Sequence, residues 1–330
     1  MSHHMAPSAG QPSKRKKRNN LISTLMILVG IGLLAAAGYM WGSAQWRYYQ
    51  QDKVNKKLAA YAKVYDAPAE GEAPRGPEVD WAGLKALNPD VVAWIQVPGT
   101  EVNYPVYEAE DNDKYLHSDA SGNYAFGGLL FCDYECTRPG MADAHTLVYG
   151  HHLLDGSMFK AIADMDNQEA FDAVDTVWYV TETATYECEP LALYYTVPDD
   201  QDVRIFKWES TEAFHKYLMD RVNRAVVKRG DAAQAVPGIT HALSLITCNY
   251  YNGFGRTVLI CVPKTEAAQG ISGVTAQLPA EMLTAPVADP AATPATEPAV
   301  DPAAEPTEEE WVEETTEEWV EETTEEWTEE

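Results

Sequence analysis

LSLITC, at residues 243–248, is an apolar run that ends in a cysteine. Arg256 follows eight residues later and opens the next apolar run, TVLI at 257–260, while His151 comes soon after an earlier one, TLV at 146–148. A thiol, a guanidinium and an imidazole are a nucleophile, a permanent cation and a proton carrier, the groups that acyl transfer through a thioester requires. Each lies at one end of a predicted core strand, where side chains converge on a cleft.

The charge of the chain is strongly negative and unevenly distributed. The net charge is -27 over 330 residues, yet residues 14–18 form a basic block near the start. Residues 307–330 carry 13 glutamates and no basic residue. Nucleic-acid binding needs basic patches, so this balance argues against a nucleic-acid partner.

Residues 21–42 contain no charged side chain. About 20 such residues, at ~1.5 Å per residue, span the ~30 Å hydrocarbon core of a bilayer. Trp41 and Trp46 fit the aromatic belt at one interface, and the basic block orients the N-terminus toward the cytoplasm. A cleaved signal peptide is the competing interpretation. We favour an uncleaved single-pass anchor, because the apolar stretch is long for a signal peptide and the following cleavage site is weak.

The composition divides the chain into six segments. We expect a cytoplasmic basic tail, a transmembrane helix, a helical stalk with a linker, a catalytic domain, a Pro/Ala/Thr-rich linker and a disordered acidic tail with periodic tryptophans. Their expected bounds are 1–20, 21–42, 43–79, 80–265, 266–306 and 307–330.

Short β runs separated by Gly, Pro, Asn and Asp predict a mainly antiparallel sheet or closed barrel. The expected strands are 91–97, 102–107, 128–132, 145–149, 176–181, 186–196, 242–247 and 257–262. A short helix capped by Asp80 precedes them, and helical insertions are expected at 157–173 and 211–229. The fold class is therefore mainly β.

The chain has five cysteines, and an odd number leaves at least one free thiol outside the cytoplasm. Cys132 and Cys136 could pair across a turn, a question that the sequence leaves open. Cys188 and Cys261 fit small core residues on strands. The Cys132-x3-Cys136 spacing lacks the further ligands of a structural zinc site, and a glycine-rich phosphate loop is missing. We expect no metal and no cofactor.

Taken singly, Cys248, His151 and Arg256 fit a buried thiol, a structural histidine and a solvated arginine. The segments around these three residues, taken together, favour a different interpretation. YGHH at 149–152 with DGSMF at 155–159 resembles the histidine segment of sortases, SLITC at 244–248 their cysteine segment, and GR at 255–256 their arginine strand. Further likeness, to class B sortases, lies in WIQVPGT at 94–100, YPV at 104–106, DNDKYL at 111–116 and GLLFCD at 128–133. The resemblance runs from about residue 80 to residue 263, and the predicted helix at 211–229 matches the insertion of class B.

This resemblance implies an eight-stranded β-barrel and a membrane-anchored transpeptidase that cuts surface proteins at a C-terminal sorting signal. Cys248 would form the thioester, His151 would act as general acid and base, and Arg256 would stabilise the oxyanion or hold the substrate backbone. The acceptor would be an amine on a cell-wall precursor or a pilin lysine. By position the resemblance also implies substrate-binding residues, namely Asn112, Leu116, Tyr149, Ile246 and Thr247.

Two departures from the family and two alternatives accompany this hypothesis. Ile246 stands where the class often has a small hydroxyl residue, and the acidic tail is foreign to the catalytic domain. A membrane-anchored cysteine peptidase would use the same groups but release its product to water. A non-catalytic surface scaffold would act through the acidic tail. The sorting-signal sequence, the oligomeric state and the choice between wall anchoring and pilin polymerisation stay open at this point.

Overall fold

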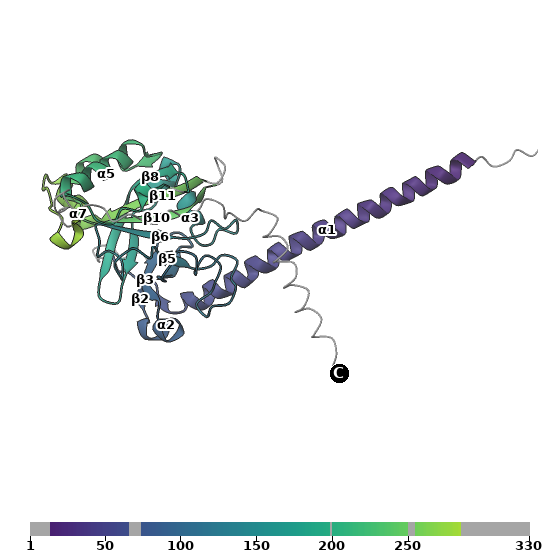
Figure 1. Ribbon diagram of the computed structural model, residues 1–330, viewed down its shortest axis with the longest axis horizontal. Helices are drawn as coiled ribbons and strands as arrows, with labels where there is room; N and C mark the ends of the chain where they lie inside the picture. Colours follow the sequence, from purple (N-terminus) through teal and green to yellow (C-terminus); the bar gives the residue numbers. More distant parts are fainter. Residues whose placement is uncertain (1–13, 66–73, 199, 250–254, 285–330) are drawn as a thin grey trace, which may run out of the picture. The chain divides into compact units, whose positions relative to one another are not determined.

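The computed structural model describes residues 14–65, 74–198, 200–249 and 255–284. One long helix, α1 (Lys14–Ala59), leads into a β-barrel that carries short helices on its outer surface (Figure 1). The acidic tail expected at 307–330 lies outside the described residues.

Within this part of the chain, eight strands close into a ring in the order β11-β10-β6-β5-β4-β3-β7-β8, and β8 pairs back with β11. They are β3 (Val91–Gln96), β4 (Asn103–Tyr107), β5 (Leu130–Cys132), β6 (His145–Tyr149), β7 (Val177–Val180), β8 (Thr185–Thr196), β10 (Ala242–Asn249) and β11 (Gly255–Pro263). The pairs β4–β5 and β6–β10 are parallel, and the other pairs in the ring are antiparallel. The expected mainly β, eight-stranded closed barrel is confirmed.

Alternation along the strands divides the core into an interior and an outer layer. On β10, Leu243 and Leu245 pack in the cluster that fills the barrel, whereas Ala242 and Ile246 pack in a second cluster with α5 (Thr211–Asn223). All four side chains are buried. A strand residue therefore faces the interior or the outer layer according to its place in this alternation.

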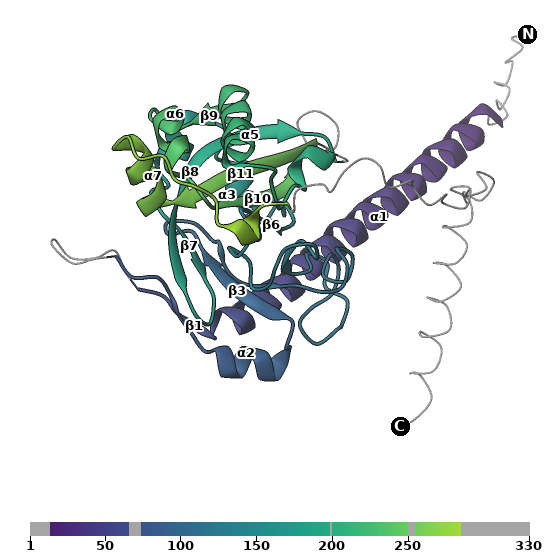
Figure 2. The ribbon, with the colours of Figure 1, turned by 60° about the vertical axis from the view of Figure 1, so that its left-hand side comes forward.

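The helices lie on two sides of the barrel. Figure 2 shows α5, α6 (Ala232–Ala235) and α7 (Lys264–Ile271) on one side and α2 (Trp81–Leu87) on the other. Asp80 caps α2 as expected, since Gly83 N donates to its carboxylate at 2.9 Å. The remaining short elements are β1 (Ala62–Lys63), β2 (Glu78–Val79), α3 (Lys160–Ala163), α4 (Gln168–Asp172), η1 (Gln201–Val203), β9 (Val227–Lys228), η2 (Val236–Gly238) and η3 (Ala280–Met282).

Both predicted helical insertions were too long. The helix expected over 211–229 ends at Asn223, and Val227–Lys228 forms β9 against β8 instead. The β-branched pair at 226–227 suits a strand, and Val226 N donates to Leu193 O at 2.8 Å. The insertion expected over 157–173 divides into α3 and α4, because Asn167 starts a new helix by accepting a hydrogen bond from Ala170 N.

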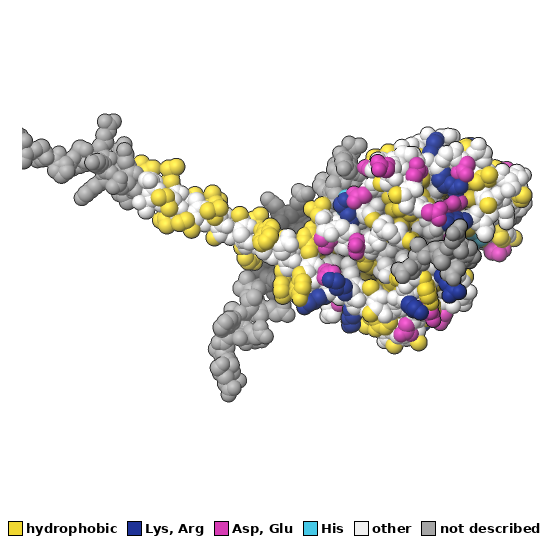
Figure 3. All heavy atoms as spheres, turned by 180° about the vertical axis from the view of Figure 1, so that it is seen from behind, with side chains coloured by type: hydrophobic (Ala, Val, Ile, Leu, Met, Phe, Trp, Pro, Cys, Tyr) yellow, Lys and Arg dark blue, Asp and Glu magenta, His cyan; other side chains and the backbone are white. Residues whose placement is uncertain are grey.

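Helix α1 continues through the apolar stretch without a break. Its part from Ile22 to Ala59 is long and apolar enough to cross a membrane by length and composition. Exposed apolar side chains cover this helix, whereas charged side chains are spread over the barrel (Figure 3). The last turns differ, because Leu58 is buried with Leu84 of α2 against β3 and β4.

The segment after β11 belongs to the globular part, which therefore extends past the boundary expected at 265. Leu278 and Met282 are buried in the outer layer beside α5. The backbone then pairs with Trp208, whose N–H donates to Met282 O at 3.2 Å and whose carbonyl accepts from Thr284 N at 2.9 Å. Trp208 lies in the connection between β8 and α5, so this segment fastens the end of that connection.

Candidate active site

Cys248 and Arg256 lie directly opposite each other on the antiparallel pair β10–β11. Side chains at such positions have Cβ atoms about 4.5–5.5 Å apart and share one face of the sheet. That face is the outer one, because Cys248 alternates in phase with Ile246 and Arg256 with Val258, both of the outer layer. Cys248 is a free, partly exposed thiol, as an attacking nucleophile must be.

Strand β6 brings His151 to the same end of the barrel. It runs parallel to β10, with Tyr149 beside Ile246, and Gly150 N donates to Ile246 O at 3.0 Å. His151 and Cys248 lie two residues beyond these paired positions. The register therefore places the backbone of both residues at the same end of these neighbouring strands.

The hydrogen bond of His151 fixes its tautomer. Nε2 lies 2.8 Å from the carbonyl oxygen of Leu116, which can only accept, so Nε2 carries the proton and Nδ1 is the basic nitrogen. Burial of the ring lowers the pKa of His151, and the positive charges of His117 and Arg256 lower it further.

Two neighbouring histidines contact this group, and sequence reasoning assigned a role to neither of them. The ring of His117 stacks on His151 with centroids 5.2 Å apart and planes 27° apart. His152 Nδ1 lies 3.1 Å from the carbonyl oxygen of Cys248 and so donates to the backbone of the nucleophile. Consecutive residues point to opposite sides, which is why His151 and His152 reach different partners.

Comparison with known proteins agrees with this geometry. A family model described as the sortase domain matches residues 95–264, more than half of the chain. The chain belongs to the sortase family. It is 29% identical to sortase B of Listeria monocytogenes over 247 residues, which cover 74% of this chain and 97% of that protein.

Solved structures of sortase B share the fold. The crystal structure from Clostridium perfringens is 30% identical, with a TM-score of 0.50, and the match covers 55% of this chain and 97% of that one. Sortase B from B. anthracis in complex with AAEK2 is 25% identical, with a TM-score of 0.53, covering 65% and 96%. The chain is thus a class B sortase, and its family is one of cysteine transpeptidases that act on surface proteins.

The five residues expected to bind substrate in this sortase have different surroundings. Tyr149 and Ile246 line a small pocket together with Arg256. Leu116 supplies the carbonyl that holds His151, and Thr247 is 2% exposed, on the strand face opposite to that of Cys248.

Asn112 is engaged with its neighbours instead of projecting freely. Its amide donates to Asp133 Oδ2 at 3.1 Å, and its carbonyl accepts from Tyr134 N at 3.2 Å. Asp133 also accepts from Tyr149 Oη at 2.8 Å. This carboxylate, which the sequence did not single out, joins two of the five expected substrate-binding residues.

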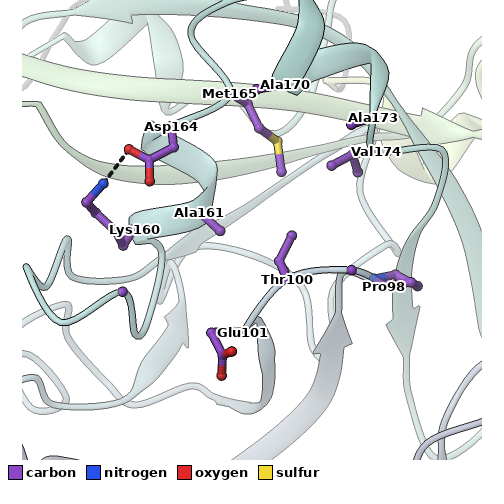
Figure 4. A pocket seen from close by; sticks show the side chains of 12 residues that line it. Pro98, Thr100, Glu101, Lys160, Ala161, Asp164, Met165, Ala170, Ala173 and Val174 are labelled. Carbon is purple, nitrogen blue, oxygen red and sulfur yellow. Dashed lines mark hydrogen bonds and ion pairs between the residues drawn. The ribbon is translucent and has the colours of Figure 1, made fainter.

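A second pocket, of about 410 Å³, lies between the β3–β4 turn and helices α3 and α4. Figure 4 shows Met165 and Val174 at its apolar side and the ion pair of Lys160 with Asp164 at its rim. No cysteine or histidine lines it, so it lacks the groups of acyl transfer. Among the described residues, no cluster of His, Cys, Asp and Glu could hold a metal ion.

Proposed function

We propose that this sortase is a membrane-anchored transpeptidase that cleaves a C-terminal sorting signal through a thioester on Cys248 and transfers the acyl group to an amine. The observation that carries the proposal is the register that sets Cys248 opposite Arg256 while β6 ends beside them with His151. A nucleophile, a proton carrier and a fixed cation then share one outer face. The same arrangement favours an acyl-transfer enzyme over a scaffold.

Cys248 and His151 divide the chemistry between them. The Cys248 thiolate attacks the carbonyl carbon of the scissile peptide bond, and the protonated Nδ1 of His151 gives its proton to the leaving amine. The thioester remains after the C–N bond breaks. The incoming amine then loses a proton to Nδ1, attacks the thioester carbon and expels the Cys248 thiolate.

Arg256 faces the attacked carbonyl from the neighbouring strand. Its planar guanidinium is always charged and donates several hydrogen bonds in fixed directions. It therefore stabilises the oxyanion of each tetrahedral intermediate or holds the substrate backbone beside Cys248. Tyr149 and Ile246 contact the substrate in the pocket that they share with Arg256, whereas Asn112, Leu116 and Thr247 shape the groove around it.

The N-terminal segment anchors this catalytic domain in the membrane. Residues 21–42 cross the bilayer, the basic residues before them stay in the cytoplasm, and the barrel lies outside the cell. The proposed domain organisation is a cytoplasmic tail (1–20), a transmembrane helix (21–42), a stalk and linker (43–79), the catalytic domain (80–265), a linker (266–306) and the acidic tail (307–330). The globular part continues past the catalytic domain through residue 284. The amine acceptor is then a cell-wall precursor or a pilin lysine, both of which are met on that side of the membrane.

A transfer assay tests the function. The full chain in detergent is incubated with peptides that contain candidate sorting signals from surface proteins of the same genome. One reaction receives an amine that models a cell-wall peptide, another a lysine-containing pilin peptide, and a third no acceptor. We expect a product joined to one acceptor, detected by mass spectrometry. Hydrolysed peptide in all three reactions, with no acceptor in any product, would mean a peptidase.

The pH profile tests the role assigned to His151. The pair of Cys248 and His151 must hold one proton between them, so kcat/KM should be bell-shaped. On the acid side the doubly protonated pair loses its first proton from His151, whose pKa is lowered by burial and by the nearby cations. The acid limb should therefore have its midpoint below the ordinary histidine value of about 6.5.

Replacing His117 sharpens this test. His117→Gln removes the electrostatic effect by which His117 lowers the pKa of His151, so that pKa rises and the acid limb should move to higher pH. His241→Gln is the control, because His241 contacts Glu266 at 2.6 Å instead of His151. An acid limb that stays in place in His117→Gln would contradict the assignment of that limb to His151.

A further inference from the structure

The small pocket lined by Arg256, the residue opposite Cys248, has one wall made of strand residues and one made of a connection. Tyr149, Ile246 and Arg256 form the first wall. The second is formed by residues at and after the end of β8, namely Thr196, Val197, Pro198, Asp200, Gln201, Val203 and Arg204. They follow β8, and the regular structure among the described residues of this connection is the short 3-10 turn η1, Gln201–Val203. The position of the second wall therefore depends on side chains that fasten it to the barrel.

Arg204 provides such a fastening. Its Nε donates to Asp133 Oδ2 at 2.8 Å and its Nη2 to Asp133 Oδ1 at 2.9 Å, so the two groups form a bidentate pair. Nη2 also lies 3.1 Å from Glu135 Oε2, and the guanidinium carbon lies 5.4 Å from the centre of the Tyr134 ring. One arginine of the connection is thus held by three consecutive residues after β5.

Asp133 transmits this contact to the opposite wall. Its side chain is fully buried, and it accepts from Tyr149 Oη at 2.8 Å and from Asn112 Nδ2 at 3.1 Å in addition to Arg204. Burial opposes ionisation, but the hydrogen bonds from Arg204, from the backbone N–H of Glu135 and from Tyr149 hold the pKa of Asp133 below its usual range. The carboxylate is therefore charged, and its charge is matched by one guanidinium.

Two other side chains hold the same connection without reaching the pocket's first wall. Arg221 Nη2 donates to Asp202 O at 3.2 Å, and His145 Nδ1 donates to Ile205 O at 3.1 Å. Both of these bonds go to backbone carbonyls. Thr196 pairs with Arg256 where β8 ends, and beyond that point the Arg204–Asp133 pair is the one side-chain hydrogen-bond link from the described connection toward the facing wall, through Asp133 to Tyr149.

We propose that Arg204 and Asp133 are positioning residues that set the distance between the two walls and so determine which sorting-signal peptides fit beside Cys248. This inference rests on the proposed function, because it assumes that a peptide occupies the pocket during transfer. Loss of Arg204 frees the connection and leaves a buried carboxylate without its cation. Asp133 is then no longer held in place, so it no longer fixes the orientation of the Tyr149 hydroxyl that donates to it.

The test compares Arg204→Met, Arg204→Lys, Asp133→Asn and the double variant Asp133→Asn/Arg204→Met in the full chain. With the peptide that wild type transfers, Arg204→Met should raise KM about tenfold or more and change kcat less than about threefold. Arg204→Lys keeps the charge but not the fork, so it should recover only part of the loss. The kcat/KM of the double variant should fall by less than the sum of the free-energy losses of the two single variants predicts. The reason is that the double variant no longer buries an unmatched charge.

The matched control is Arg229→Met. Arg229 forms a similar bidentate pair with Asp231, at 3.0 and 2.9 Å, and its backbone pairs with Leu191, at the part of β8 away from the pocket. We expect this variant to keep the wild-type KM. Equal KM changes in Arg204→Met and Arg229→Met would overturn the inference.

Hydrogen–deuterium exchange separates this inference from the proposed function. Backbone amides of residues 200–206 should exchange faster in Arg204→Met than in wild type or Arg229→Met, whether or not the protein transfers any peptide. Unchanged exchange in that segment overturns the positioning role even if transfer is observed. A wild-type chain that transfers nothing overturns the proposed function, and the exchange result still decides whether Arg204 fastens the connection.

Discussion

Cys248→Ala should abolish transpeptidation, with a loss in kcat on the order of 10⁴-fold or more. Without the thiolate no thioester forms, and the reaction would need direct attack by an amine on an unactivated peptide bond. His151 and Arg256 stay in place in this variant, yet neither group can replace the covalent step. The measurement is product formation with the accepted peptide and amine, together with intact-protein mass spectrometry for the acyl-enzyme when the acceptor is omitted.

The other cysteines supply the controls. Cys188 and Cys261 are buried on β8 and β11, and burial raises the pKa of both thiols, so they are poor nucleophiles. Cys188→Ala should keep the acyl-enzyme signal, and alkylation of wild type by iodoacetamide should label Cys248 first. An acyl-enzyme that persists in Cys248→Ala would move the nucleophile to another residue and remove the basis of the mechanism.

Local patterns predicted the strands well because the strands are short apolar runs whose alternate side chains are buried in the barrel interior and in the outer layer. The expected strand at 242–247 is β10, and that at 257–262 is β11, with ends that shift by one or two residues. The register between them could not be predicted from either strand alone. It follows from pairing across the hairpin, and it alone shows that Cys248 and Arg256 face each other.

The histidines illustrate where sequence reasoning ends. His145 lies on β6, six residues before His151, and is fully buried between Ile205 O and Ser244 Oγ. Burial lowers its pKa to about 4, so it stays neutral and both of its ring nitrogens are engaged. The structure thus separates a histidine that links two core strands from one at the groove, although both flank the same apolar run.

Contacts between distant segments were beyond sequence reasoning altogether. Arg204 and Asp133 are 71 positions apart, and each lies in a connection with no periodic pattern. The helix over 211–229 was overestimated for a related reason, since Val226 and Val227 find a partner in β8 that no local pattern indicates. Local propensity continues a helix at that point, and pairing with a distant strand ends it.

Arg256→Lys should reduce kcat/KM by about 10²–10³-fold, the loss that follows removal of one donor to a developing oxyanion. Lysine keeps the positive charge on β11 opposite Cys248, but its ammonium cannot donate two parallel hydrogen bonds from one plane. The expected loss therefore measures the geometry of the guanidinium and not its charge alone. Arg224→Lys is the control, because Arg224 is an exposed residue at the end of α5 that pairs with Asp220.

Chemical rescue decides what the Arg256 guanidinium does. In Arg256→Ala, added guanidinium ion can enter the space left beside Cys248 and supply the missing donors, so activity should recover in proportion to its concentration. Methylammonium at the same concentration should recover less, since it carries the charge without the fork. If Arg256→Ala kept wild-type kcat/KM with neither ion added, charge at this position would be unimportant for the transition state, and Arg256 would have to be assigned to packing at the edge of β11.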